Sequence, residues 1–150
     1  MRQLAFDFDA APLPSPPVSG TDPARSARAA RREKGRLAWL SGEAAEDAVA
    51  RVYEARGVEV LARRWRGESG EIDLVLRAPD SYVFCEVKRA GTFDAALARL
   101  RRGQLERIYS AASEYLGLTA EGQLAPVRFD VAAVDGIGAV HLQEGAFGHF

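Results

Sequence analysis

The sequence predicts an α/β (α+β) fold in which a mixed central sheet is flanked by helices, and two kinds of pattern predict it. Two apolar runs, residues 71–76 and 83–88, alternate with a period of two, which sends successive side chains to opposite faces of a strand. Apolar residues spaced three and four apart precede and follow these runs, over residues 41–56 and 93–116, and predict amphipathic helices. With one strand before the pair and two after the second helix, the expected order is αβββαββ.

The remaining elements follow from interruptions in these patterns. Ser41 is predicted to cap the first amphipathic helix, and Gly57 is predicted to end it. Gly103 interrupts the second helical pattern and marks a candidate break, since glycine weakens a helix interior. The other three strands are expected over residues 58–65, 127–134 and 138–142.

The N-terminal part of the chain has a different composition from the rest. Residues 10–23 are rich in Pro and Ser and too poor in apolar side chains to pack a core, so residues 1–23 are expected to be a disordered tail and linker. The domain is expected over residues 24–150, beginning with a helix, because residues 23–40 are rich in Ala and Arg. We expect the basic face of this helix to be solvated, with contact to phosphate groups as the alternative.

Three charged side chains lie inside the two alternating runs. Their connection, residues 77–81, contains Pro, Asp and Ser, which favour a tight turn, so the runs should form an antiparallel hairpin. A hairpin symmetric about this connection places Asp73 opposite Glu86 and Glu71 opposite Lys88. Opposed Cβ atoms lie roughly 5 Å apart, where like charges are destabilising. A divalent cation between Asp73 and Glu86 would offset that repulsion.

The two carboxylates suit Mg²⁺ or Mn²⁺, ions that take oxygen ligands and keep waters for a substrate phosphate. Lys88, two residues beyond Glu86, is placed to orient an attacking water and to stabilise charge on a phosphoryl oxygen. The pattern indicates metal-assisted hydrolysis of a phosphodiester. The alternative is a solvated strand face on which Glu86 and Lys88 form a weak ion pair.

Several segments together resemble the small uncharacterised YraN family, which is itself similar to the PD-(D/E)xK nucleases. That superfamily has the restriction-endonuclease-like fold and includes archaeal Holliday-junction resolvases. The resemblance covers roughly residues 35–147. It is carried by Gly42-Glu43, by Gly-Glu-Ile-Asp-Leu-Val at 70–75, by Val-Phe-Cys-Glu-Val-Lys at 83–88, by the Ala-rich helical stretch that follows and by Arg-Phe-Asp-Val at 128–131.

The resemblance implies a role for each matching residue. Asp73 and Glu86 would bind metal, and Lys88 would be the catalytic lysine. Glu43, on the first helix, matches an additional acidic ligand, although a carboxylate in the first turn of a helix also favours the helix dipole. Gln104 matches a polar residue that many superfamily members carry on the helix after the catalytic strand, and a solvated helix position is its alternative.

Charge and composition narrow the function classes. The net charge of −1 and pI near 6.1 give no overall nucleic-acid signature. Residues 24–107, however, hold 18 Lys and Arg against 13 Asp and Glu, whereas residues 108–150 hold one Arg against five acids. The basic excess coincides with the candidate site, as a phosphate-backbone substrate would require. A surface of mixed charge is the alternative.

The sequence contains no candidate membrane span or secretory signal and only one cysteine, and these features predict the protein's location and exclude an intrachain disulfide. No apolar run approaches the length of a membrane span, and Asp7 and Asp9 lie where a secretory signal would be apolar, so we expect a cytoplasmic protein with no membrane partner. The single cysteine, Cys85, excludes an intrachain disulfide and is expected to be a buried small hydrophobe facing away from the site. His141 and His149 lack zinc-ligand spacing.

The sequence thus predicts a Mg²⁺- or Mn²⁺-dependent nuclease that acts on DNA, and by analogy with the resolvases on branched or damaged DNA. That analogy also leaves a homodimer open. The rival prediction is a non-catalytic nucleic-acid-binding or adaptor module on the same scaffold. Recruitment to a sliding clamp is a further hypothesis, because the N-terminal peptide resembles clamp-docking motifs through Gln3, Leu4, Phe6 and Phe8.

Overall fold

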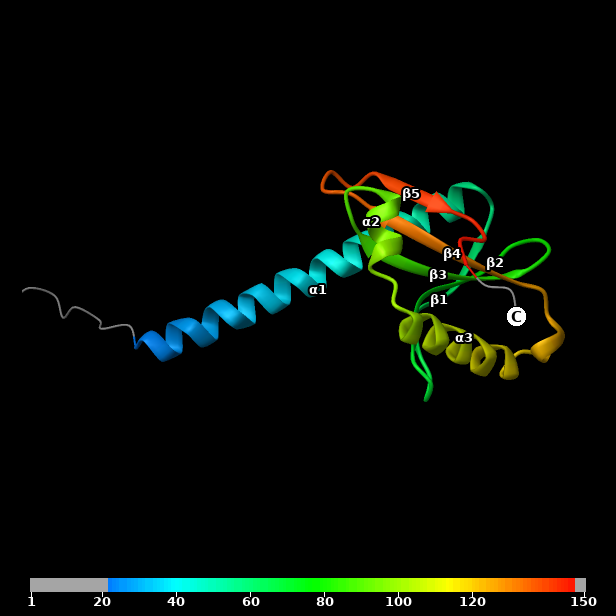
Figure 1. Ribbon diagram of the computed structural model, residues 1–150, viewed down its shortest axis with the longest axis horizontal. Helices are drawn as coiled ribbons and strands as arrows, with labels where there is room; N and C mark the ends of the chain where they lie inside the picture. The colour runs from blue at the N-terminus through cyan, green and yellow to red at the C-terminus, as the bar shows by residue number, and fades with distance from the viewer. Residues whose placement is uncertain (1–21, 148–150) are drawn as a thin grey trace, which may run out of the picture. The chain divides into compact units, whose positions relative to one another are not determined.

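The computed structural model describes residues 22–147, without the side chains of residues 36–41. Residues up to Arg36 and residues from Leu37 onward form two separate units. The first contributes the beginning of helix α1, where every described residue is exposed. Figure 1 shows the elements in chain order: α1 (Pro23–Ala55), β1 (Glu59–Arg66), β2 (Glu71–Arg77), β3 (Tyr82–Arg89), α2 (Phe93–Ala98), α3 (Arg102–Gly117), the 3-10 helix η1 (Gly122–Leu124), β4 (Val127–Val134) and β5 (Val140–Gln143).

In the described part of the chain, five strands form one sheet in the order β1-β2-β3-β4-β5. All neighbouring strands are antiparallel except β3 and β4, which run parallel because α2 and α3 carry the chain back between them. The predicted mixed sheet and α+β class are therefore confirmed. No helix among the described residues is both long enough and apolar enough to cross a membrane.

The hairpin of β2 and β3 has the register predicted from its turn. Backbone pairing runs from Arg77 and Tyr82 to Leu74 and Cys85 and ends there. Beyond this point β3 continues beside β4 as far as Arg89, so the ends of β2 and β3 are free to diverge. The two strands therefore leave an opening at the positions where the sequence placed its carboxylates.

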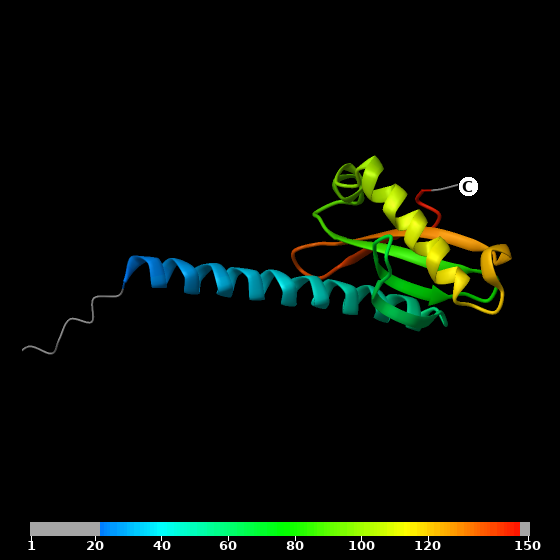
Figure 2. The same cartoon turned by 90° about the horizontal axis from the view of Figure 1, so that it is seen from below.

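Helices cover both faces of the sheet (Figure 2). The part of α1 from Leu37 onward packs through Ala45, Val49 and Tyr53 against one face, which includes Leu74 and Cys85. Helix α3 covers the other face, where its apolar residues meet Ile72, Val75, Tyr82, Phe84 and Phe129. Each face thus buries one helical stripe, as amphipathic helices require.

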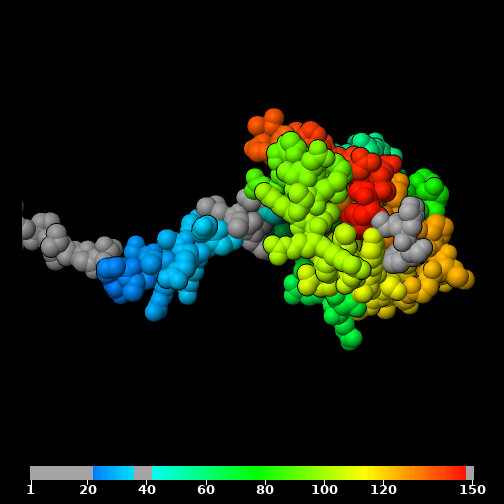
Figure 3. Space-filling model, viewed as in Figure 1, coloured from blue at the N-terminus to red at the C-terminus, as the bar shows by residue number. Residues whose placement is uncertain are grey.

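The C-terminal segment lies on the α3 side of the molecule. Phe147 stacks on Phe129, with 5.7 Å between ring centroids, and Tyr109 of α3 contacts the Phe129 ring edge-on at 4.8 Å. In the space-filling view the red C-terminal residues adjoin the yellow-green surface of α2 and α3 (Figure 3). The contacts extend the apolar cluster under α3 to the last described residues.

Helix α1 differs from its predicted bounds. The predicted cap at Ser41 is wrong, because the helix is continuous from Pro23 to Ala55. The sequence between these residues is rich in good helix formers, and its glycines cost about 1 kcal/mol each without breaking the helix. The predicted end at Gly57 is confirmed: Gly57 has a left-handed φ of 77°, and the amide of Val58 donates to the carbonyl of Tyr53 at 3.0 Å.

The second predicted helix is two helices. The break falls at residues 99–101, and Gly103 lies in the first turn of α3 rather than at the break. The two helices have different partners: Ala96 of α2 packs with Val131 and Ala133, whereas Ile108 of α3 belongs to the cluster around Phe84. The break lets each apolar stripe reach its own part of the sheet.

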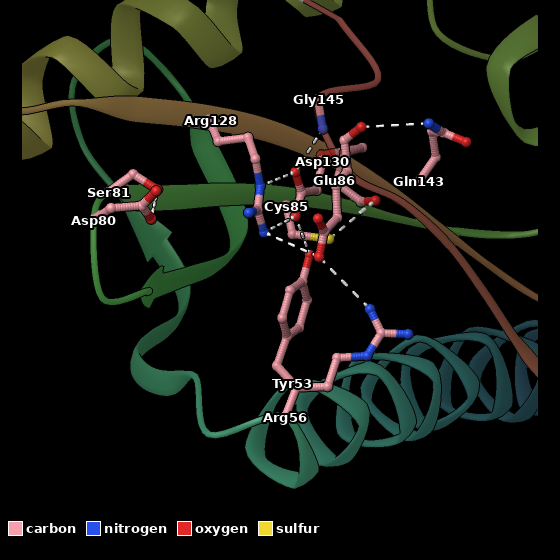
Figure 4. Close-up of polar contacts among 11 residues, drawn as sticks. Tyr53, Arg56, Asp80, Ser81, Cys85, Glu86, Arg128, Asp130, Gln143 and Gly145 are labelled. Atoms are coloured by element: carbon pink, nitrogen blue, oxygen red, sulfur yellow. Dashed lines mark hydrogen bonds and ion pairs between the residues drawn. The ribbon is translucent and has the colours of Figure 1, made fainter.

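A buried polar network joins α1 to β4 (Figure 4). The carboxylate of Asp130 is fully buried and accepts a hydrogen bond from the Tyr53 hydroxyl at 2.6 Å. Arg128 binds the same carboxylate through two nitrogens, each at 2.9 Å, and the amide of Gly145 donates at 3.0 Å. A buried charge is tolerated when it is paired and hydrogen-bonded, and Asp130 meets both conditions.

Cys85 lies next to this network, on the face away from the cleft described below. Its side chain is 1% exposed and packs in the cluster beneath α1, as predicted. Burial raises the pKa of the thiol, and the nearby Asp130 charge raises it further. The thiol is therefore protonated and unreactive at neutral pH.

Replacing Asp130 with Ala is expected to lower the free energy of unfolding by about 3–5 kcal/mol, because Arg128 would lose its two-point carboxylate partner and keep only the longer pair with Glu144, at 3.6 Å. Tyr53→Phe removes one hydrogen bond and is expected to cost about 1–2 kcal/mol. Urea unfolding followed by circular dichroism measures both. The control is Glu121→Gln, whose partly exposed pair with Arg77 contributes at most about 1 kcal/mol. Equal losses in all three variants would contradict a special role for the network.

Candidate active site

A cleft of about 310 Å³ opens where β2 and β3 diverge, and α3 forms its other wall. It contains the carboxylates that the sequence singled out, together with side chains of α3. The residues that line it are Gly70, Glu71, Asp73, Glu86, Gln104, Arg107 and Ile108.

On β3, Glu86 lines the cleft, and Lys88, two residues further along the strand, contacts it, as the alternation predicts. Oε1 of Glu86 accepts a hydrogen bond from Nε2 of Gln104 at 2.7 Å, and Nζ of Lys88 lies 2.9 Å from the same oxygen. The Glu86 side chain is only 8% exposed, so these contacts are shielded from water. The structure thus brings Glu86, Lys88 and Gln104 together.

Asp73 completes the group from β2. Its Oδ2 accepts a hydrogen bond from the backbone amide of Val87 at 2.8 Å, a donor that the end of the β2–β3 ladder leaves free. Burial raises the pKa of Asp73 to about 7, and the negative charge of Glu86 contributes to the rise. The two carboxyl groups therefore lie close enough for the charge of Glu86 to oppose ionisation of Asp73.

The predicted alternation on β2 fails at its first residues. Ile72 was expected to share a face with Leu74 and Leu76, but it packs with Val75 in the cluster under α3. The strict period ends where the pairing with β3 ends. Freed from that pairing, the strand turns so that Asp73 faces the amide of Val87.

Arg64 lies in β1 opposite Asp73, between the paired positions Arg63–Leu74 and Trp65–Ile72. Its φ of 46° is unusual for a residue with a side chain and costs roughly 1–3 kcal/mol. Its Nε lies 2.7 Å from Oε2 of Glu46, a residue of α1. Local backbone strain therefore accompanies an ion pair at the edge of the candidate site.

The structure does not bring Glu43 into the cleft. Its side chain is exposed, and its charge acts on Arg64, whose pKa is raised first by the hydrogen bond to Glu46 and further by the Glu43 charge. Glu46 is the buried carboxylate of α1. Burial raises its pKa, the hydrogen bond from Arg64 opposes the rise, and the negative charge of Asp73 adds to it.

Sequence reasoning missed Glu46, but a signal was present. Glu46 lies within the apolar stripe of α1, next to Ala45 and one turn before Val49 and Ala50, all of which are buried. A charged side chain inside a buried helical stripe needs a partner. Glu43 and Glu46 lie in adjacent turns of α1, but only Glu46 lies on the side of the helix that is buried.

The donor set fits a hard divalent cation. Among the described residues, no three His, Cys, Asp or Glu side chains are placed to hold a metal ion by themselves. Mg²⁺ needs no such cage, because it binds through one or two carboxylates and keeps several waters. Asp73 and Glu86 provide that pair at the bottom of a cleft. The clamp-like peptide at residues 3–8 and His149 lie outside the described residues.

The mixed sheet, the divergent strands and the convergent carboxylates define a small α/β domain with an acidic cleft. The chain belongs to the family described as Uncharacterised protein family UPF0102, whose profile matches residues 45–134. UPF0102 is the YraN family, so the resemblance seen in the sequence is confirmed. The matched segment includes Glu46 and all the described residues of β2 and β3.

The bacterial relatives are matched over most of their own length. The UPF0102 protein of Ruegeria pomeroyi is 49% identical over 116 residues, which cover 77% of this chain and 94% of the relative. A UPF0102 protein of Cereibacter sphaeroides is 51% identical over 113 residues, covering 75% and 97%. The UPF0102 protein of Dinoroseobacter shibae is 45% identical over 109 residues, covering 73% and 81%. These names assign no activity, so the chemistry of the site rests on its geometry.

Asp73 makes the stability of the metal-free protein depend on pH. Because the pKa of Asp73 is about 7 in the folded protein and ordinarily 3.8, the protonated group stabilises the folded state, and this stabilisation is present below pH 3.8 and is lost as the pH rises to about 7. As the pH is raised from 5 to 8.5, wild type should therefore lose stability relative to Asp73→Asn, which has no carboxyl group to ionise at this position. We expect the difference in Tm, measured in EDTA, to grow by about 5 °C or more. A constant difference across this range would contradict the shift.

Proposed function

We propose that the protein is a metal-dependent nuclease that hydrolyses phosphodiester bonds in DNA. The observation that supports this proposal is the convergence of Asp73, Glu86 and Lys88 at the opening between β2 and β3. Holding two carboxyl groups together in a buried position is unfavourable, as the raised pKa of Asp73 indicates. A module that only binds nucleic acid requires cations and gains nothing from this arrangement.

Asp73 and Glu86 would hold Mg²⁺ or Mn²⁺. The ion would polarise a phosphoryl oxygen and lower the pKa of a bound water. Gln104 and Lys88 both contact Oε1 of Glu86, so they fix the orientation of this carboxylate. The amide of Val87 does the same for Asp73. Preorganised oxygens of this kind are what a site for a hard cation requires.

Lys88 has a second role in this proposal. Its side chain is 22% exposed, so the ammonium group is reachable from solvent while it remains next to Glu86. From this position it would orient the attacking water and stabilise the negative charge that builds on the phosphoryl oxygens. Glu46, held by Arg64, would add negative charge through a water.

The substrate class rests on charge and on analogy. The described beginning of α1 exposes a row of basic side chains, and such a row attracts a phosphate backbone. These residues are Arg25, Arg28, Arg31, Arg32 and Lys34. The likeness of the family to resolvases favours branched or damaged DNA, which is a fold-level analogy. DNA binding without cleavage, in an adaptor recruited through the N-terminal peptide, is the rival function.

The proposal is tested with purified protein and labelled single-stranded, duplex, flap and four-way-junction DNA, in Mg²⁺, Mn²⁺ or EDTA. We expect cleavage that requires the metal and that falls at least about 100-fold in Glu86→Gln, which loses a metal ligand, and in Lys88→Met, which loses the cation beside the reacting phosphate. The matched control is Glu71→Gln. Glu71 lines the same cleft, but its side chain is paired with Arg66 and exposed, so this variant should keep most of the activity.

Each outcome of this experiment distinguishes the two functions. Metal-dependent cleavage that is lost in Glu86→Gln and kept in Glu71→Gln supports the nuclease. Binding of DNA by wild type and Glu86→Gln alike, with no cleavage under any condition, would establish the adaptor and leave the carboxylate pair without a catalytic role.

The two acidic residues of α1 are expected to differ. Glu46→Gln should weaken the binding of Mn²⁺ about tenfold, because the removed charge lies within electrostatic reach of Asp73. Glu43→Gln should leave it unchanged, since the Glu43 side chain is exposed and outside the cleft. Mn²⁺-dependent shifts in Tm measure both affinities without reference to activity. Equal effects of the two substitutions on Mn²⁺ affinity would contradict a specific contribution of Glu46 to metal binding.

A further inference from the structure

Helix α3 brings three neighbouring side chains to the cleft. Gln104, Arg107 and Ile108 are spaced three and four apart, so they lie on one side of the helix. Gln104 donates to Glu86, and Ile108 is 4% exposed in the apolar cluster. These two contacts fix the helix, and Arg107 is the member of the set whose side chain remains exposed.

The base of Arg107 is held close to the start of β2. A Cβ atom on Gly70 would lie 3.4 Å from the carbonyl oxygen of Arg107 and 3.5 Å from its Cβ, so the backbone before β2 lies within van der Waals reach of the helix at this position. The turn before Gly70 is bound to the same helix. The amides of Glu68 and Ser69 donate to the carboxylate of Glu114 at 2.9 and 3.1 Å.

Arg107 also differs from the basic residues around it in its ion pairing. Lys88 is paired with Glu86, and Arg66 with Glu71, both at 2.9 Å. Among the described residues that line the cleft, Arg107 is the only basic one, and no described carboxylate pairs with it. A guanidinium group is thus available at the wall of an otherwise acidic cleft.

We propose that Arg107 binds a backbone phosphate of the nucleic-acid substrate next to the phosphate that is cleaved. This inference rests on the proposed function. A guanidinium group matches a phosphate with two parallel hydrogen bonds and keeps its charge at any physiological pH. Arg107 lies one helical turn beyond Gln104, which contacts Glu86, so its ligand is a neighbouring phosphate. The contact is to the backbone and is therefore independent of base sequence.

Arg107 also answers an electrostatic requirement of the cleft. Glu71, Asp73 and Glu86 line it, and a phosphodiester has to approach all three. Because Lys88 is already paired with Glu86, the anionic substrate needs a second cation on the opposite wall. Arg107 provides that cation on a rigid helix, whose position is fixed before the substrate arrives.

The test is the affinity for labelled duplex and four-way-junction DNA, measured by fluorescence anisotropy with Ca²⁺ in place of Mg²⁺ and between about 50 and 200 mM salt. Arg107→Ala should weaken binding about tenfold and reduce the slope of log affinity against log salt by about 0.9, which corresponds to one lost phosphate contact. Arg107→Lys should restore the slope. Arg102→Ala is the matched control on the same helix, since Arg102 is exposed and paired with Glu106.

The outcomes separate this inference from the proposed function. Wild-type cleavage with unchanged affinity and salt slope in Arg107→Ala would overturn the phosphate site and leave the nuclease intact. Equal losses in Arg107→Ala and Arg102→Ala would overturn it as well, because the effect would then be one of general charge. Binding that depends on Arg107 without any cleavage would support the phosphate site and overturn the nuclease. An unchanged Tm of the variants shows that folding is not the cause.

Discussion

The closeness of two carboxyl groups, Asp73 and Glu86, is the constraint on which the rest of the site depends. Two like charges in a buried position repel each other, and the surrounding contacts compensate for this. The Val87 amide donates to Asp73, while Gln104 and Lys88 both contact Glu86. Each of these groups is supplied by an element whose position is fixed elsewhere in the fold. The carboxylate pair therefore destabilises the protein locally, and contacts with the surrounding strands and helix offset this cost.

The divergence of β2 and β3 follows from the way the sheet is built. One edge of β3 pairs with β4 along its whole length, whereas the other edge pairs with β2 only as far as Leu74 and Cys85. The parallel pair is the rigid part, anchored by Asp130 on the α1 side and by Phe129 on the α3 side. Strand β2 can then depart from it without loss of the core, and the opening forms between a fixed strand and a departing one.

The fold and the central residues could be predicted from local patterns, because turn chemistry fixes a hairpin register and a period of two fixes which side chains meet. That reasoning paired Asp73 with Glu86 and placed Lys88 beside Glu86, and the structure brings these three side chains close together. The same reasoning failed for features that are set by tertiary contacts and not by local sequence. No Pro or Gly stands at the break before α3, which arises because two apolar stripes have different partners. Whether Glu43 or Glu46 is buried depends on which side of α1 packs against the sheet. The change of face at Ile72 depends on where the hydrogen-bonded pairing of β2 with β3 ends.

The donors to Asp130 come from widely separated parts of the chain: the Tyr53 hydroxyl near the end of α1, the Arg128 guanidinium on β4 and the Gly145 amide beyond β5. This has a consequence for synthesis on the ribosome. A nascent chain that ends before Gly145 cannot complete the hydrogen bonds of this carboxylate, and burying it without them is costly. The order of translation thus delays completion of these hydrogen bonds until Gly145 has emerged, and a product truncated before Gly145 would keep the Asp130 carboxylate with fewer donors.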